Sequence, residues 1–110
     1  MRKKLDPLLH NELRLAIVSL LVKDGEADFI YLKEKTKATS GNLSVQLDKL
    51  SEAGYISIKK EFKGKKPHTT CIITQKGIEA FEKYVQAIRD YLDIYSYPMY
   101  KNYRKSTPPL

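Results

Sequence analysis

Apolar residues repeat at two different spacings along the chain, and the change of spacing divides it into segments. Between residues 9 and 21 they recur three and four positions apart, as on one face of an α-helix. The same spacing returns over residues 43–53 and 78–95. Between these segments lie two β-rich runs, 55–58 and 69–74, separated by EFKGKKPH with its turn residues Gly64 and Pro67. The pattern predicts a mainly α protein with one small β-hairpin, an α+β fold.

Residues that are typical of helix ends lie at both ends of these segments. Aspartate and serine accept backbone hydrogen bonds before a helix, proline fits its first turn, and glycine follows its last turn. The predicted boundary residues are Asp6 with Pro7 and Gly25 for the first helix, Asp28 for a short second helix, and Ser40 and Gly54 for the third.

Outside its leucine stripe, the third helix carries short side chains that can form hydrogen bonds. Asn42 and Gln46 could bond an adenine edge, and Val45 could pack on a thymine methyl group. An ordinary amphipathic helix with a solvated face explains the same pattern. If the helix enters a DNA groove, the expected contact residues are Ser40, Gly41, Asn42, Ser44, Val45, Gln46 and Lys49.

The predicted hairpin is strongly basic. Five lysines between residues 59 and 66 face a single acid, Glu61. Such a run can simply protect a strand edge from pairing, but its position after a candidate recognition helix favours contact with DNA phosphates. The residues expected to make that contact are Lys63, Lys65, Lys66, His68 and Thr69.

The stretch GNLSVQLDKLSEAGYISIKKEFKGKKPHTTCIITQKGIEAFEKYV resembles small bacterial and archaeal winged-helix transcriptional regulators related to the MarR and ArsR groups. The resemblance covers roughly residues 6–92 and includes HNELRLAIVSLL as the first helix. It implies a winged helix-turn-helix with a long C-terminal helix, acting as a dimeric repressor on double-stranded DNA. Relatives often carry a basic residue or histidine at the positions of Val45 and Gln46, a departure that bears on the operator sequence and not on the mode of binding.

Composition agrees with a DNA partner. The 110 residues suit one domain, and the net charge of +7 with a pI of about 9.4 favours a polyanion. A single cysteine, Cys71, excludes an internal disulfide, and no apolar run is long enough to span a membrane, so a cytoplasmic location is expected. His10, His68 and Cys71 have no metal-ligand spacing, and no catalytic motif is present. We therefore expect no enzyme activity, metal or cofactor.

The last apolar stripe exceeds what one domain core needs. A helix over residues 75–95 would be ~30 Å long. Its surplus is a candidate dimer seam, although folding back on the first helix is the alternative. The seam residues are Val85, Ile88, Leu92 and Tyr95.

These segments divide the chain into a winged-helix core (1–74), a C-terminal helix (75–95) and a tail (96–110) that begins near the helix-ending Pro98. The tyrosine-rich tail is expected to pack on a partner subunit or to be mobile, rather than to bind nucleic acid.

Two function classes remain open at this level. One is a sequence-specific DNA-binding transcriptional regulator. The other is a winged-helix module that binds protein without reading bases, since a fold alone does not assign function. Steep salt dependence of binding to duplex DNA separates them. The sequence identifies neither an operator nor a small-molecule effector.

Overall fold

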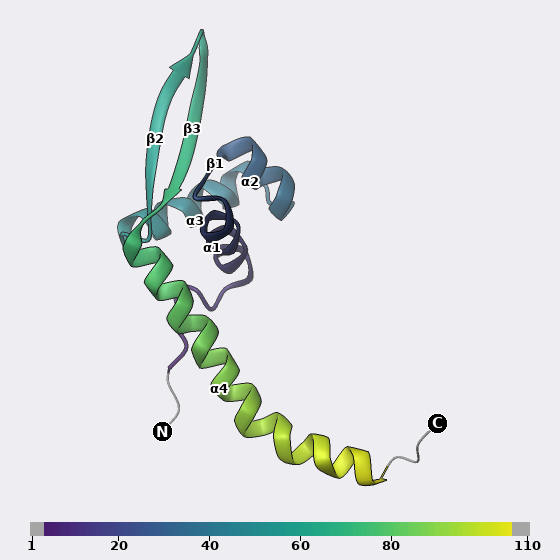
Figure 1. Cartoon of the computed structure of the whole chain (residues 1–110). Coiled ribbons are helices and arrows are strands. Elements are labelled where there is room, and N and C mark those ends of the chain that lie inside the picture. The colour runs from purple at the N-terminus through teal and green to yellow at the C-terminus, as the bar shows by residue number, and fades with distance from the viewer. Residues whose placement is uncertain (1–3, 107–110) are drawn as a thin grey trace.

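The computed structural model describes residues 4–106, with side chains placed for residues 4–93. It contains four helices and three strands within that range (Figure 1). Their order is α1 (Glu12–Asp24), β1 (Glu26–Asp28), α2 (Phe29–Thr36), α3 (Ser40–Glu52), β2 (Ile56–Lys63), β3 (Lys66–Ile73) and α4 (Gln75–Ser106). The predicted α+β fold, with a helical body and a β-hairpin, is confirmed.

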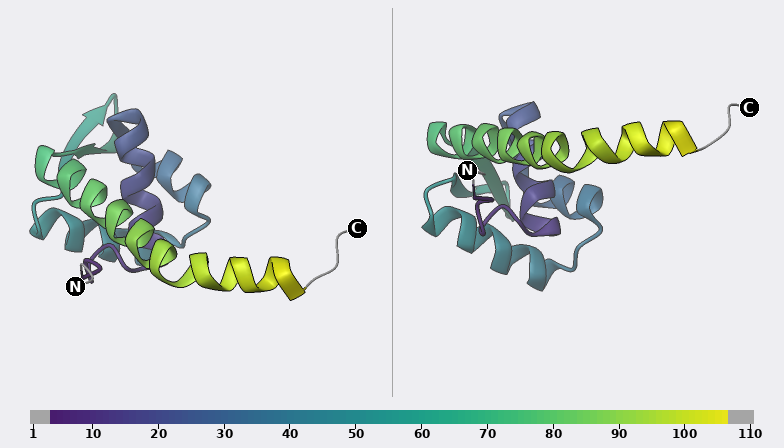
Figure 2. Two further views of the ribbon diagram at one scale, coloured as in Figure 1. Left: turned by 60° about the horizontal axis from the view of Figure 1, so that its bottom comes forward. Right: turned by 90° about the horizontal axis from the view of Figure 1, so that it is seen from below.

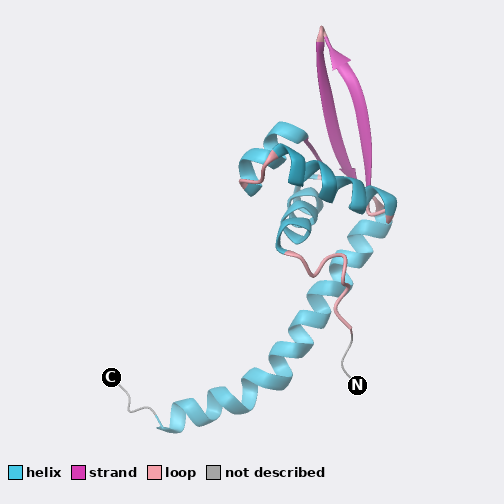
Figure 3. Ribbon diagram, turned by 180° about the vertical axis from the view of Figure 1, so that it is seen from behind, coloured by secondary structure: helices cyan, strands magenta, loops and turns pink. Residues whose placement is uncertain are grey.

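The three strands form one antiparallel sheet in the order β1-β3-β2. The sequence did not predict β1, which is three residues long and pairs Ala27 with Cys71 at the base of β3. Between the hairpin turn and Thr69, the residues of β3 pair only with β2. The distal half of the hairpin therefore projects from the helical body as a two-stranded arm, the wing (Figures 1 and 3).

The core gathers around α1. This helix lies between α3 on one side and α4 on the other (Figure 2). The leucine stripe predicted for α3 is buried as expected. The buried core comprises Leu9, Ile17, Val18, Leu21, Leu32, Leu43, Leu47, Leu50, Ile56, Cys71 and Tyr84.

The first helix begins later than predicted. Asp6 closes only one turn, in which its Oδ1 accepts a hydrogen bond from the Leu8 backbone N–H at 2.9 Å. The chain then inserts Leu9 fully into the core, and α1 starts at Glu12 after an Asn11 cap. The buried leucine takes the chain out of a helical path, so a good cap at Asp6 is not followed by a long helix. Gly25 ends α1 as predicted, with φ 88°.

The third helix is capped one residue earlier than predicted. Thr39 has extended backbone angles, and its side chain accepts a hydrogen bond from the Asn42 N–H at 3.2 Å. Ser40 is therefore the first helical residue instead of the cap. Asp28 caps α2 as predicted, accepting from the Tyr31 N–H at 2.8 Å.

The last helix is longer than the sequence predicted. It runs to Ser106 and through Pro98, so the expected helix end near residue 95 and the non-helical start of the tail are wrong. Proline removes one backbone donor and bends a helix without always ending it. The distal third of α4 turns away from the line of its first part (Figures 1 and 3).

Hydrogen bonds of the Thr74 hydroxyl join the base of the wing to α4. The Thr74 hydroxyl donates toward the carbonyl oxygens of Gly54 (2.6 Å) and Tyr55 (3.0 Å), and accepts from the Gly77 N–H at 3.1 Å. Gly77 is buried against the Tyr55 carbonyl, where a Cβ atom would lie 2.2 Å from that oxygen. The close approach explains why glycine occupies the first turn of α4.

Candidate nucleic-acid interface

The third helix presents three surfaces outside its buried leucines. Val45, half exposed, lies opposite the core, and Lys49 is exposed near it. Ser44 lies on the flank toward the wing. Asn42 and Gln46 lie on the opposite flank, toward α1. The residues predicted to contact DNA are thus spread around the helix, and only part of the set faces directly outward.

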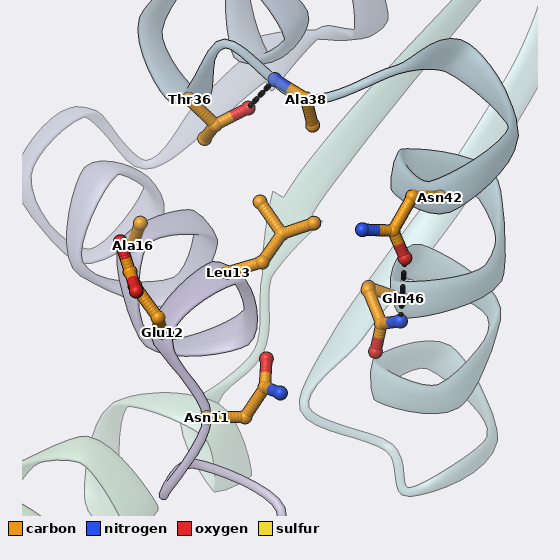
Figure 4. A pocket seen from close by; sticks show the side chains of 8 residues that line it. All are labelled: Asn11, Glu12, Leu13, Ala16, Thr36, Ala38, Asn42 and Gln46. Atoms are coloured by element: carbon orange, nitrogen blue, oxygen red, sulfur yellow. Dashed lines mark hydrogen bonds between the residues drawn. The ribbon is translucent and has the colours of Figure 1, made fainter.

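Gln46 is held by its neighbours. Its Oε1 accepts a hydrogen bond from Nη1 of Arg14. Its Nε2 donates to Oδ1 of Asn42 at 2.9 Å (Figure 4). Arg14 is in turn fixed through Nε, which donates to the Leu8 carbonyl oxygen at 2.6 Å. This chain of bonds links the N-terminal turn to α3 and orients both amides. Sequence spacing gave no sign of it, because Arg14 and Gln46 are 32 positions apart.

A polar crevice separates α1 from the start of α3. It has a volume of about 440 Å³, and in Figure 4 the Asn42 and Gln46 side chains extend from α3 into it, toward Leu13 of α1. The lining residues are Asn11, Glu12, Leu13, Ala16, Thr36, Ala38, Asn42 and Gln46. The crevice leaves these amides reachable from outside the protein.

On its other flank, α3 borders the wing. A smaller crevice of about 150 Å³ brings Ser44 and Asp48 of α3 together with Lys60 and Thr69 of the hairpin. Lys60 and Thr69 are register partners across β2 and β3. Lys60 was not among the predicted contact residues. The period-two alternation that places Lys60 on the same face of the strand as buried Ile56 and partly buried Ile58 was available in the sequence as a signal.

The turn of the wing is tight and well defined. Lys63 pairs with Lys66, which leaves Gly64 and Lys65 as a two-residue loop. Gly64 has φ 66° and Lys65 does not have a positive φ, as in a type II′ hairpin turn. The backbone twist of such a turn matches the twist of the two strands, so β2 and β3 stay paired up to the turn.

The charges of the wing are divided between its two faces. Lys63 and His68 lie on the face turned away from α3, together with an ion pair between Lys59 and Glu61 at 3.7 Å. Lys66 shares that face because it pairs with Lys63, whereas Thr69 lies on the α3 side. The predicted phosphate-binding residues therefore surround the arm instead of lining one side of it.

A polar helix flanked by a basic hairpin is the arrangement of winged-helix DNA-binding proteins. A family model described as a winged helix DNA-binding domain matches residues 13–92. This chain belongs to the winged-helix DNA-binding family. The predictions of a winged-helix regulator fold and of a non-enzymatic DNA-binding protein agree with that membership.

Individual proteins and solved structures are also similar to this chain. The uncharacterized protein MJ0432 of Methanocaldococcus jannaschii is 37% identical over 81 residues, which cover 74% of this chain and 88% of the relative. A transcriptional regulator homologue from Pyrococcus horikoshii OT3 superposes with a TM-score of 0.73 at 26% identity, over 78% of this chain and 85% of the other. The YusO protein from Bacillus subtilis shares the fold at 16% identity and a TM-score of 0.69, over 83% of this chain and 60% of its own.

The opposite side of the winged-helix domain carries an apolar groove between α1 and α4. Its volume is about 440 Å³, and Val85 and Ile88 line it while remaining partly exposed. Leu92 follows on α4 and is 56% exposed. The predicted seam residue Tyr95 lies beyond the described side chains. Tyr84 and Ala87 are buried, so α4 does pack against its own chain, but only over part of its circumference.

The remaining candidate chemistry is structural. Cys71 is fully buried in the core, and burial, followed by the charge of Asp28, raises the pKa of its thiol to about 11. His10, in the segment before α1, forms a hydrogen bond through Nδ1 with the Tyr84 hydroxyl of α4 at 2.9 Å. Among the described residues, no group of three or more His, Cys, Asp or Glu side chains is arranged to hold a metal ion. No helix of the described part is long and apolar enough to cross a membrane.

Proposed function

We propose that this winged-helix protein is a sequence-specific transcriptional repressor that binds double-stranded DNA as a homodimer. One observation carries the proposal: Ser44 and Asp48 of α3 and Lys60 and Thr69 of the wing border a single crevice. A helix and a basic hairpin that share one surface can engage a major groove and the adjacent backbone together. A bound dimer would block access to a promoter, and we place the protein in the cytoplasm.

Base reading is assigned to the exposed and α1-facing sides of α3. Val45 and Lys49 extend toward bases directly, and Ser40, Gly41 and Ser44 approach at the start of the helix. Asn42 and Gln46 read from the polar crevice, with Arg14 holding the Gln46 amide in one orientation. A preset amide loses less conformational freedom on binding, which favours discrimination between bases.

The test begins with selection of bound genomic fragments and footprinting, which define the operator. Gln46→Ala should then cost ~1–3 kcal/mol at one base position and relax specificity there. Gln75→Ala, which truncates an exposed glutamine at the start of α4, is a matched control that should change nothing. Equal losses on operator and random duplex would contradict base reading by Gln46.

Phosphate contact is assigned to Lys63, Lys65 and Lys66, assisted by His68 and Thr69. Lys65 occupies the hairpin turn itself, so it extends furthest along the arm. Lys65→Ala should weaken binding to all sequences alike and lower the salt slope by about one unit. Lys23→Ala, an exposed lysine at the end of α1, controls for net charge. An unchanged slope in the Lys65 variant would refute the contact.

Assembly is assigned to the apolar groove and the outer side of α4. Val85, Ile88, Leu92 and Tyr95 would meet their two-fold mates, with Leu15 of α1 helping to line the groove. Such a dimer should bind an imperfect palindrome whose half-sites lie about one helical turn, roughly 34 Å, or a multiple of it apart.

Leu92→Glu should therefore separate the dimer and abolish operator binding while the wing domain stays folded. Glu79→Gln, a charge change on an exposed residue near the start of α4, is the control. Sedimentation decides the question. A wild-type chain that is monomeric at micromolar concentration, both free and on DNA, would rule out the dimer.

A further inference from the structure

The wing carries an aromatic residue that the phosphate contacts do not explain. Phe62 is 73% exposed, the highest value among the large apolar side chains that the structure describes. It pairs with Pro67 across the hairpin, one register step before the Lys63–Lys66 pair that closes the turn. Two apolar side chains therefore stand beside each other near the tip of an otherwise cationic arm.

Phe62 lies on the side of the wing that faces the third helix. Alternation along β2 places it on the same face as Ile58 and Lys60, which border the crevice with α3. Phe62 is four positions beyond Ile58, which corresponds to ~13 Å along a strand. A B-DNA major groove is about 12 Å wide. With α3 in the major groove, the ring would thus reach past the phosphate strand to the neighbouring minor groove.

The surrounding charge selects the partner. Lys60, Lys63, Lys65 and Lys66 lie within four residues of Phe62 and are all exposed. An apolar protein surface would have to remove water from these ammonium groups without compensation. A nucleic acid offers phosphates for the lysines and apolar sugar and base edges for the ring, and minor-groove proteins use phenylalanine and proline as wedges between base steps.

We propose that Phe62, supported by Pro67, is an apolar wedge that enters the minor groove beside each half-site and bends the duplex. The proposal rests on the DNA binding proposed above. It adds a contact that reads deformability instead of base edges, so flexible TA and CA/TG steps should be favoured at the flanks of the operator.

The wedge and the lysines make separable predictions. Burial of a phenylalanine ring would supply a salt-independent part of the affinity, so Phe62→Ala should weaken operator binding about tenfold or more. It should leave the salt slope unchanged because no counterion is released by the ring. Lys65→Ala should instead change the slope. Phe62→Leu keeps an apolar wedge and should retain most of the affinity.

The experiment uses the full chain on footprinted operator duplexes. Affinity is measured at several salt concentrations, and DNA bending is measured by energy transfer between dyes at the duplex ends. Ile30→Ala is the matched control, because Ile30 is a large apolar side chain on α2 with a similar exposed fraction of 66%. The expected result is lower affinity and a smaller bend for Phe62→Ala, with wild-type slope, melting temperature and sedimentation.

Each contrary result has a distinct meaning. Wild-type affinity and bend in Phe62→Ala would overturn the wedge while leaving the proposed DNA binding intact. A change in sedimentation without DNA would overturn it in favour of a contact between copies of the chain. Absence of salt-dependent DNA binding by the wild-type protein would refute the proposed function, and the wedge with it.

Discussion

Replacing Gly77 with alanine should destabilise the protein, although the same change in a helix usually stabilises it. Glycine in a helix costs about 0.5–1 kcal/mol relative to alanine, so the local backbone preference favours the substitution. The new Cβ would, however, lie 2.2 Å from the carbonyl oxygen of Tyr55 and 2.8 Å from Cδ1 of Ile73. The first turn of α4 and the start of β2 would have to separate by roughly 1 Å, because interiors pack without spare room.

The magnitude follows from what that separation disturbs. The Tyr55 carbonyl accepts hydrogen bonds from the Thr74 N–H at 3.1 Å and from the Thr74 hydroxyl at 3.0 Å. Loss of two such bonds is worth about 2 kcal/mol, and overpacking adds about 1–3 kcal/mol. After the gain of up to about 1 kcal/mol from helix preference, the net destabilisation should be about 2–4 kcal/mol.

Urea unfolding followed by circular dichroism measures this difference in the free energy of unfolding. Gly41→Ala is the matched control, because Gly41 also lies in the first turn of a helix but has nothing within 4 Å of its Cβ position. It should stabilise α3 by up to about 1 kcal/mol. If the two substitutions change stability in the same direction and by similar amounts, the close-approach argument is wrong.

Three further changes probe the hydrogen bonds and the core. Arg14→Leu should destabilise the fold by about 1.5–3 kcal/mol in urea unfolding, because the charged hydrogen bonds of Arg14 are lost. The same substitution should cost less in a Gln46→Ala background, where one of its partners is already missing. Equal losses in both backgrounds would show that the two residues are not coupled. Burial, then the hydrogen bond to Asp6 and its charge, raises the pKa of Tyr55 to about 12, so folding favours the neutral phenol. Its contribution to stability should be complete below pH 10 and disappear between about pH 10 and 12, and the stability difference from Tyr55→Phe should show this loss. Cys71, with its thiol pKa raised to about 11 by burial and by Asp28, should react with a maleimide much more slowly in the native protein than in urea at pH 8, and equal rates would contradict its burial.

Local features of the structure were largely readable from the sequence. The leucine stripe of α3, the Asp28 cap, the Gly25 helix end and the Gly64 turn all depend on neighbours within a few positions. Helix periodicity, backbone caps and tight turns have residue requirements that act over this short range. For the same reason, the position of the candidate recognition helix and its basic hairpin could be predicted without coordinates.

Features that depend on distant partners were not readable in this way. Strand β1 exists because Ala27 meets Cys71, 44 positions later, and three residues alone carry no pattern. The Arg14–Gln46 bond likewise forms only when α1 packs beside α3. Periodicity states which side of an element is apolar, but not which polar neighbour will be brought to the other side.

The sequence by itself therefore determined the kind of domain, its buried stripes and its basic hairpin. Tertiary structure decided that Arg14 holds the Gln46 amide and that Gly77 permits α4 to approach Tyr55. The physical reason is common to these cases: side-chain orientation and close backbone approach are set by contacts between segments far apart in the chain, whereas helix and turn preferences are set by adjacent residues.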